Sequence, residues 1–380
     1  MDFGLSEDQR LMVDAVDGFA RRHLPPEEVR RRDQAHEPPD DLLPALAELG
    51  ILGLPIPEHY GGLGRGWETV ALVQERLGYH AGMAASLINR VVCFGAMSIL
   101  EHGSDAQKAD LLPKIINGEL LFSLALSEPG AGTDAGALVS SASRTDDGWR
   151  INGRKSWISG ADTSHYLVTA CRTERGSRGS KGVSMFLVPQ DAPGISMTLL
   201  EKVGNNCLSS WDIGFDDVTV DGSALLGEEG RGFRQMMTTL QYSRTGQAAN
   251  AVGQAQAAVD LALAHAKERE QFGQPIGKFQ VIQHRLADMQ TRVDQARWML
   301  YHLAWCIANG LPCRKEAAQA KLVASETLVE IAQHGMQIMA SAGYAIESDM
   351  QRIWRDSRLY TFGEGTSEIQ RDLIAREMGL

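Results

Sequence analysis

The 380-residue sequence has few cysteines, no excess of basic residues and no leader-like start. Its five cysteines are an odd number at wide spacings, which argues against a disulfide framework and against a metal cluster. A formal net charge of −11 argues against non-specific binding to nucleic acid. The apolar runs fall far short of a membrane span, and the N-terminus has neither a basic region nor an apolar core. We therefore expect a cytoplasmic protein with no membrane span, no nucleic-acid partner and no bound metal.

The hydrophobic pattern divides the chain into three parts. Residues 1–120 keep helical spacing, residues 121–226 contain short runs separated by Asp-Gly, Gly-Ser and Pro-Gly turns, and residues 227–380 return to long helical segments. Strands and helices are segregated, which excludes a doubly wound nucleotide-binding sheet. The pattern predicts an α+β fold that is mostly α, with an N-terminal helical domain, a middle antiparallel β-sandwich or barrel-like domain, and a C-terminal helical domain.

Near the C-terminus, one carboxylate lies between two glycines, in Gly363-Glu364-Gly365. Ser367 followed by Gln370 has the spacing of a capping box, which predicts a helix that begins near Glu368. Glycines allow the backbone to approach a ligand closely, and backbone N–H groups beside a helix start can bind an anion or a carbonyl oxygen. The segment has the features of an active-site loop, but a solvated loop glutamate or a helix-capping carboxylate is the alternative.

Two segments of the middle domain have features of a binding site for a flat ligand. An apolar strand runs into a glycine-rich bend over residues 124–134, for which a connecting loop is the alternative. Trp157 and Ser159 are two residues apart on a short strand and should share one face. An aromatic face and a hydroxyl suit an isoalloxazine ring, although a buried core tryptophan is the default interpretation.

Two segments of the C-terminal part combine polar or small residues with a chain break. Residues 267–280 join two helices through a Gly/Pro loop and present Arg269, Phe272 and Gln280, which suit a pyrophosphate and an adenine ring. An exposed helix–helix turn would have the same composition. Residues 337–344 close a helix with small residues, which fits close backbone approach to a ligand or plain helix packing.

Together these segments resemble the acyl-CoA dehydrogenase family in their order and over essentially the full length of the chain. The resemblance implies a C-terminal four-helix bundle, FAD bound between the middle domain and the bundle, and a homotetramer built as a dimer of dimers. In that family each FAD contacts two chains, and the reduced flavin passes its electrons to an electron-transfer flavoprotein.

The resemblance also assigns residues, which here carry this chain's numbers. Glu364 falls on the catalytic base. The implied FAD contacts are Leu124, Leu126, Ser127, Thr133, Trp157, Ser159, Arg269, Phe272, Gln280, Gln337, Ser341, Thr366 and Glu368. The implied substrate contacts are Thr133, Gln241, Ser243, Arg244, Gly363 and Gly365.

Several positions depart from the common family pattern. Ser243 stands at the second place where the family can hold its base, which leaves Glu364 as the candidate. Ala340-Ser341 replace paired glycines, and Gly363 replaces a tyrosine, which should leave space near the reacting carbons. Glu368 replaces a frequent glutamine, and Gly204-Asn205-Asn206-Cys207-Leu208 differs from the common loop for no reason visible in the sequence.

The implied reaction is FAD-dependent α,β-dehydrogenation of an acyl thioester, carried by CoA or an acyl carrier protein, to a trans-2-enoyl product. Glu364 would take the α-proton and flavin N5 the β-hydride. The same site could serve an enoyl-thioester reductase or an oxidase. A non-catalytic or partner-dependent subunit of a hetero-oligomeric dehydrogenase is the alternative from another class.

Overall fold

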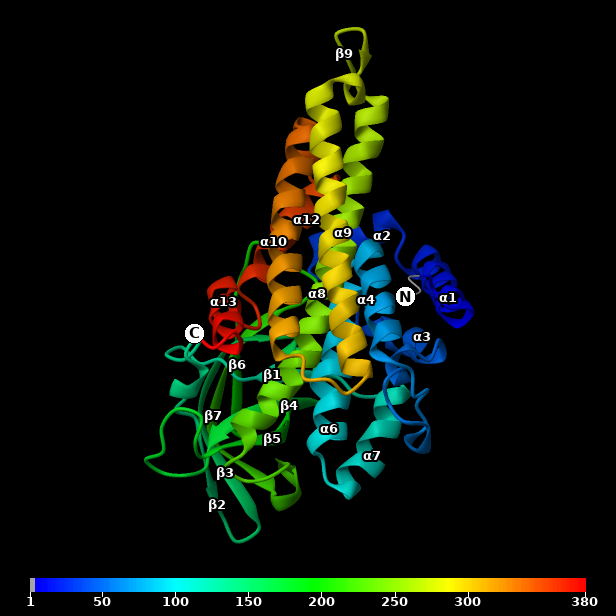
Figure 1. The fold of residues 1–380 in the computed structure, drawn as a ribbon. Helices are drawn as coiled ribbons and strands as arrows, with labels where there is room; N and C mark the ends of the chain where they lie inside the picture. Colours follow the sequence, from blue (N-terminus) through cyan, green and yellow to red (C-terminus); the bar gives the residue numbers. More distant parts are fainter. Residues whose placement is uncertain (1–3) are drawn as a thin grey trace.

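Helices α1 to α7 form the first third of the chain in the computed structural model, which describes residues 4–380 (Figure 1). Ser6 and Ser104 begin α1 and α7 with capping boxes, in which each serine and the glutamine three residues later satisfy each other's backbone N–H groups. The helices are α1 (Glu7–His23), α2 (Pro26–Ala35), α3 (Leu43–Glu48), α4 (Trp67–His80), α5 (Gly82–Ile88), α6 (Met97–His102) and α7 (Asp105–Ile116).

Between α5 and α6 the chain continues as a π-helical segment, Asn89–Ala96, so that residues 82–102 form one continuous helical stretch. This stretch is long and apolar enough to cross a membrane, with a mean hydropathy of 1.6 in its most apolar window. The expectation that all apolar runs are too short was therefore wrong. Since 72% of that window is buried within the fold, the stretch is a core helix of this structure.

The middle part folds into one connected sheet of eight strands, and a second, two-stranded sheet lies elsewhere in the chain. The main order is β6-β7-β3-β2-β4-β5-β8, and most neighbours are antiparallel, as predicted. Strands β1 and β2, however, both pair with β4 in parallel. The strands are β1 (Phe122–Ala125), β2 (Ser141–Arg144), β3 (Gly148–Ser159), β4 (Tyr166–Arg172), β5 (Val183–Pro189), β6 (Ile195–Leu199), β7 (Ser210–Asp221) and β8 (Leu225–Leu226).

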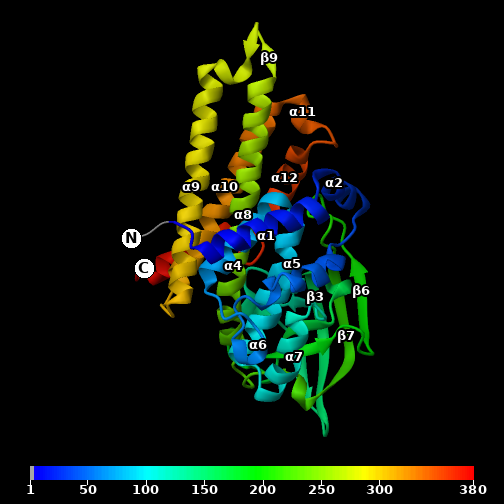
Figure 2. The ribbon, with the colours of Figure 1, turned by 90° about the vertical axis from the view of Figure 1, so that its right-hand side faces the viewer.

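The C-terminal part is built on three long helices that rise away from the sheet (Figures 1 and 2). The small residues of α8 let α4 pack closely against it: a Cβ at Gly253 would lie only 2.1 Å from the carbonyl oxygen of Glu75. The elements are α8 (Gly232–Glu268), β9 (Glu270–Gln271), β10 (Gln274–Pro275), α9 (Gln280–Ala308), α10 (Arg314–Met339), α11 (Ser341–Tyr344), α12 (Asp349–Ser357) and α13 (Ser367–Glu377).

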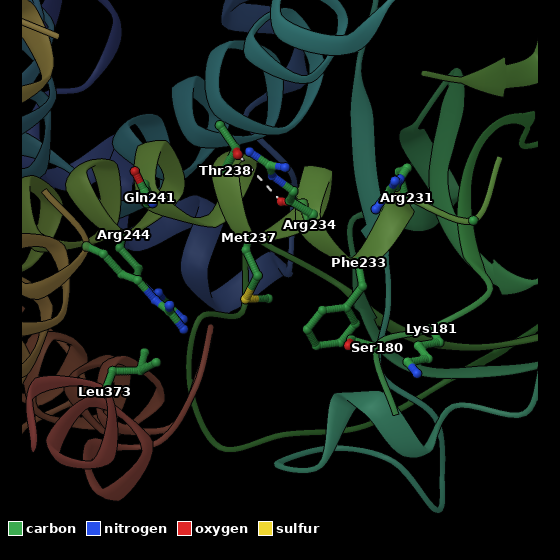
Figure 3. Close-up of a pocket in the computed structure, with 12 residues that line it drawn as sticks. Ser180, Lys181, Arg231, Phe233, Arg234, Met237, Thr238, Gln241, Arg244 and Leu373 are labelled. Carbon is green, nitrogen blue, oxygen red and sulfur yellow. Dashed lines mark hydrogen bonds between the residues drawn. The ribbon is translucent and has the colours of Figure 1, made fainter. Parts of the chain in front are cut away.

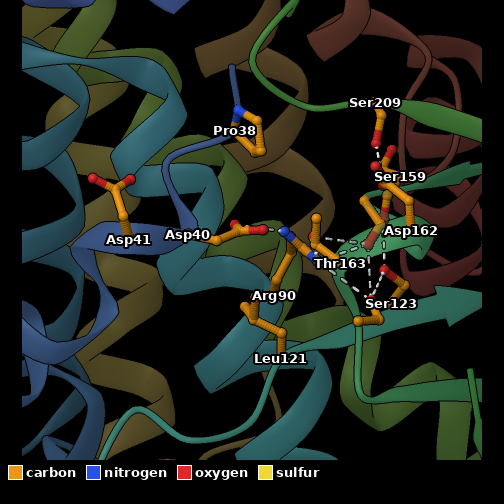
Figure 4. Close-up of polar contacts among 12 residues, drawn as sticks. Pro38, Asp40, Asp41, Arg90, Leu121, Ser123, Ser159, Asp162, Thr163 and Ser209 are labelled. Atoms are coloured by element: carbon orange, nitrogen blue, oxygen red, sulfur yellow. Dashed lines mark hydrogen bonds and ion pairs between the residues drawn. The ribbon is translucent and has the colours of Figure 1, made fainter. Parts of the chain in front are cut away.

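Arg90, in the π-helical segment, joins the N-terminal helices to the sheet (Figure 4). The residue is 3% exposed and its guanidinium donates hydrogen bonds to the carbonyl oxygens of Phe122 and Gly160. It also pairs with Asp40 at 3.2 Å. Further hydrogen bonds reach the hydroxyls of Thr163 and Ser164. This network ties three segments together and so sets the position of the sheet edge near Ser159.

Candidate active site

Glu364 lies in the loop between the 3₁₀ helix Arg358–Thr361 and α13. Its backbone adopts a left-handed conformation with φ 56°, and Gly365 follows with φ 100°. A non-glycine residue with positive φ is uncommon and is maintained only where its surroundings hold it. The backbone conformation at Glu364 therefore indicates a position fixed by its neighbours.

The carboxylate of Glu364 is held by two side chains from different parts of the chain. Asn89 Nδ2 donates to Oε1 at 3.1 Å, and the Ser243 hydroxyl on α8 donates to Oε2 at 2.8 Å. The residue is partly exposed as a whole, whereas its carboxyl group is enclosed. Burial raises the pKa of Glu364 above its ordinary range, while Ser243, Lys321, Arg244 and Asn89 act in the opposite direction. The result is a carboxylate that binds a proton more readily than a glutamate in water does.

The two carbonyl groups of Glu364 and Gly365 point into the protein. Arg244 Nε lies 3.4 Å from the Glu364 oxygen, and Gln370 Nε2 lies 3.0 Å from the Gly365 oxygen. Lys321 Nζ donates to the same Gly365 oxygen at 2.7 Å. Among residues 4–380 no group accepts a hydrogen bond from the backbone N–H of Glu364 or Gly365. The loop thus buries its acceptors and leaves its donors available.

Helix α13 begins one residue earlier than the sequence predicted. Thr366 is the N-cap, and its hydroxyl accepts from the N–H of Ile369 at 3.3 Å. Ser367 is the first helical residue and is buried. The predicted capping box fails because the Gln370 side chain reaches the carbonyl groups of Glu364 and Gly365 and does not return to the cap.

A cavity of about 520 Å³ opens between the start of α8, α13 and the loop before β5 (Figure 3). Phe233 and Met237 of α8 and Leu373 of α13 supply an apolar wall, and Arg244 connects the cavity to the Glu364 loop. Four further cations lie around it, in a chain whose net charge is −11: Lys181, Arg231, Arg234 and Arg314. The cavity therefore combines an apolar surface with a concentration of positive charge, which suits an amphipathic anion.

The structure brings together most of the predicted substrate residues. Gln241 and Arg244 line the cavity, Ser243 contacts the Glu364 carboxylate, and Gly363 and Gly365 flank Glu364. Thr133 is separate, exposed on the loop after β1. A Cβ at Gly363 would lie 3.2 Å from the Gln247 amide nitrogen and 3.2 Å from the Leu359 carbonyl oxygen, and free space near the reacting carbons stays a prediction.

The predicted FAD residues of the middle domain lie along one edge of the sheet. Trp157 is 60% exposed with φ 61°, so it is not a core tryptophan. A register irregularity between Lys155 and Ile158 turns this part of β3, and Ser159 at its end is partly buried. Leu124, Leu126 and Ser127 are partly buried at and just beyond β1. An exposed indole beside hydroxyl groups is a suitable surface for a planar ring.

The remaining predicted FAD residues lie elsewhere in the single chain. Arg269, Phe272 and Gln280 surround the β9–β10 hairpin at the far tip of the long helices, well away from β3 (Figures 1 and 2). Phe272 is 94% exposed there. Gln337 and Ser341 are exposed at the same end of the bundle, and Thr366 and Glu368 are at the start of α13. One chain does not gather these groups into one site.

Two of the unusual positions acquire a physical explanation. Ala340 has φ 50° and ψ −130°, a conformation that glycine adopts without strain, which accounts for the preference for glycine there. Asn205 has φ 53°, and its N–H donates to Asp356 Oδ1 at 2.5 Å while its amide donates to the Asp356 carbonyl. The Gly204–Leu208 loop therefore binds the end of α12.

Sequence reasoning missed Asn89 and Lys321, both of which contact the Glu364 loop. Asn89 lies 275 residues before Glu364, within an apolar helix. Lys321 is a lysine inside an otherwise apolar face of α10, where it is 1% exposed. A charged residue at a buried helical position was the available signal.

Comparison with known proteins agrees with the architecture. Models of the acyl-CoA dehydrogenase N-terminal, middle and C-terminal domains match residues 6–119, 123–218 and 230–379. The probable acyl-CoA dehydrogenase YngJ of Bacillus subtilis is 39% identical over 100% of both chains. The 3-(aryl)acrylate reductase of Clostridium sporogenes is 35% identical over 98% of this chain and 99% of that protein. The structure of butyryl-CoA dehydrogenase from Megasphaera elsdenii matches with a TM-score of 0.96, 32% identity and 100% coverage of both chains.

The fold and the matched domains define a flavin-dependent oxidoreductase. The chain belongs to the acyl-CoA dehydrogenase family. It is an FAD-dependent enzyme whose general chemistry is acyl-CoA dehydrogenation. The residues present fit this cofactor, because the exposed Trp157 and the neighbouring hydroxyls offer a surface for the ring, and the N-terminus of α13 offers backbone donors for a phosphate.

Proposed function

We propose that this enzyme removes the α-proton of an acyl-CoA thioester with Glu364 and forms a trans-2-enoyl-CoA. The observation that carries the proposal is the enclosed Glu364 carboxylate, which is fixed by Asn89 and Ser243 in a loop that Arg244 links to a cationic cavity. Bound FAD supplies the acceptor for the hydride that leaves the β-carbon. Enclosure favours proton uptake by Glu364 because its charged form has lost contact with water.

The chain's own groups would perform three tasks. Ser243 and Asn89 orient the two carboxylate oxygens before the proton moves. The available N–H of Glu364 would donate to the thioester carbonyl oxygen and stabilise negative charge as the α-proton leaves. Arg244 keeps the Glu364 carbonyl turned inward, so that the N–H of Gly365 in the same trans peptide points the other way.

The cavity supports a phosphate-bearing carrier. Its cations, Lys181, Arg231, Arg234 and Arg314, would pair with the phosphates of CoA, while Phe233 and Met237 cover the apolar part of the arm. The phosphopantetheine arm of an acyl carrier protein has one such phosphate and is the second candidate carrier.

The wider setting is proposed on the family's general behaviour. The enzyme would form a homotetramer. In it, the exposed residues of the hairpin at Phe272 would contact the FAD of a neighbouring chain. An electron-transfer flavoprotein would accept the electrons, and the protein would act in the cytoplasm.

A second candidate function is reduction of an enoyl or aryl-acrylate thioester at the same site. It is favoured by the similarity to the protein named 3-(aryl)acrylate reductase. Here Glu364 would deliver a proton to the α-carbon. If the reduced flavin passed its electrons to oxygen, the enzyme would be an oxidase. If the purified homo-oligomer lacked FAD, the chain would instead be a partner-dependent subunit.

The test is flavin bleaching of the purified protein by a panel of acyl-CoA thioesters, with Glu364→Gln as the variant and Glu330→Gln, an exposed α10 carboxylate, as its matched control. We expect the wild type and the control to bleach at similar rates, and Glu364→Gln to retain FAD but bleach about 10³-fold more slowly. Full turnover by Glu364→Gln would reject the assignment. For the reductase, enoyl-CoA is added to dithionite-reduced enzyme. Return of the yellow colour at a rate faster than acyl-CoA oxidation would favour this function.

A further inference from the structure

Lys321 is a buried lysine of α10 that the proposed mechanism does not use. It is 1% exposed, and its ammonium group donates to the Gly365 carbonyl at 2.7 Å. Within residues 4–380 no carboxylate lies within ion-pair distance of it. Burial of an ammonium group without a paired carboxylate is costly, so the fold retains this lysine at the expense of stability.

The group that Lys321 binds is the carbonyl of a glycine, whose backbone has wide conformational freedom. Gly365 has φ 100° and no Cβ, so sterics alone do not restrict it. In a trans peptide the carbonyl and the following N–H point in opposite directions. A carbonyl held inward by Lys321 and Gln370 therefore directs the N–H of Thr366 outward, and fixes the residue that follows Glu364.

We propose that Lys321 is a positioning residue for Glu364: its charge-assisted hydrogen bond to the Gly365 carbonyl holds the loop so that the carboxylate and the outward N–H groups keep their reactive geometry. The inference rests on the proposed function of Glu364. It assigns a role to a side chain that contacts neither of the reacting carbons.

Charge gives Lys321 a second effect on the same carboxylate. The charged groups that influence it are Glu364 on the loop, Arg244 on α8, Glu326 on α10 and Glu368 on α13. Burial lowers the pKa of Lys321 to about 8, so the side chain is still mostly protonated at pH 7. In that state its positive charge lowers the pKa of Glu364 and opposes the effect of burial. Removing the charge should move the Glu364 pKa upward.

The experiment compares Lys321→Met, Lys321→Gln and Lys315→Met in the FAD-loaded enzyme. Methionine removes both donor and charge, glutamine retains a donor without charge, and Lys315 is an exposed lysine on the same helix. The readouts are the pH profile of flavin reduction, kcat and KM, and hydrogen exchange of residues 361–368 by mass spectrometry. The wild type must first bleach with an acyl-CoA; if it does not, the proposed function has failed, and the exchange readout still tests whether Lys321 orders the loop.

We expect Lys321→Met to lower kcat about 10- to 100-fold with little change in KM. Its acid limb should move to higher pH, and residues 361–368 should exchange faster while the rest of α10 is unchanged. Lys321→Gln should restore part of the exchange protection but keep the shifted acid limb, and Lys315→Met should match the wild type. Unchanged loop exchange and an unchanged pH profile in Lys321→Met would overturn the proposal, as would a loss of activity accompanied only by uniform destabilisation of the fold.

Discussion

The Arg90 network and the Glu364 loop both bury a charged group where elements from distant parts of the chain meet, but they treat it differently. Arg90 is satisfied by Asp40, two backbone carbonyls and two hydroxyls (Figure 4). The Glu364 loop combines a carboxyl of raised pKa, left-handed backbone and available N–H donors. A buried charge with a full set of partners is structural, whereas one beside available donors and a left-handed backbone is suited to chemistry.

The largest change in the free energy of unfolding should come from Arg90→Met, which tests the structural role of the Arg90 network. Removing the guanidinium leaves the partly buried Asp40 without its ion-pair partner and takes one donor from each carbonyl group, which should lower the free energy of unfolding by about 3–5 kcal/mol. Denaturant unfolding of the FAD-loaded protein measures it. Arg31→Met is the control, because Arg31 also pairs with carboxylates but lies on the surface. Equal losses in both variants would contradict a structural role for burial at Arg90.

Glu364→Gln should raise the free energy of unfolding, whereas Arg90→Met lowers it, and should slow flavin reduction about 10³-fold. The native pKa of Glu364 is raised above its unfolded value, so the native state binds more protons in that window and stability falls as pH rises through it. Glutamine carries no charge, and the variant should gain about 1 kcal/mol at pH 8 and less at pH 5. Thermal unfolding at both pH values provides the measurement. A variant less stable than the wild type at pH 8 would show that the carboxylate serves the fold.

Ser243→Ala should have a small effect on stability and a specific effect on catalysis. The Ser243 hydroxyl lowers the pKa of Glu364, so its loss should raise that pKa and move the acid limb of flavin reduction to higher pH. Stability should change by about 1 kcal/mol. The control is Ser98→Ala, because Ser98 on α6 makes a buried hydrogen bond to Thr239 on α8. This variant should lower the free energy of unfolding by a similar amount without moving the pH profile. A shift of the same size in both variants would mean that the Ser243 hydrogen bond is not specific to Glu364.

The sequence determined the order of helices, strands and helices, because hydrophobic periodicity and turn residues are local properties. It also marked the Glu364 segment, since glycines around one carboxylate are visible in a short window. Only the tertiary structure decided which groups surround that carboxylate. Asn89, Ser243 and Lys321 are separated from Glu364 or Gly365 by 275, 121 and 44 residues.

The same distinction between local pattern and tertiary packing explains why the capping-box prediction was wrong. Gln370 has the spacing of a capping partner, yet it binds the loop carbonyls because the folded loop offers acceptors that the isolated helix start does not. Packing likewise decides the surroundings of Gly363, where a Cβ would lie 3.2 Å from the amide nitrogen of Gln247 on α8. Local spacing decides which hydrogen bonds are available to a segment, whereas the choice among them depends on partners that only the packed chain brings within a few ångströms.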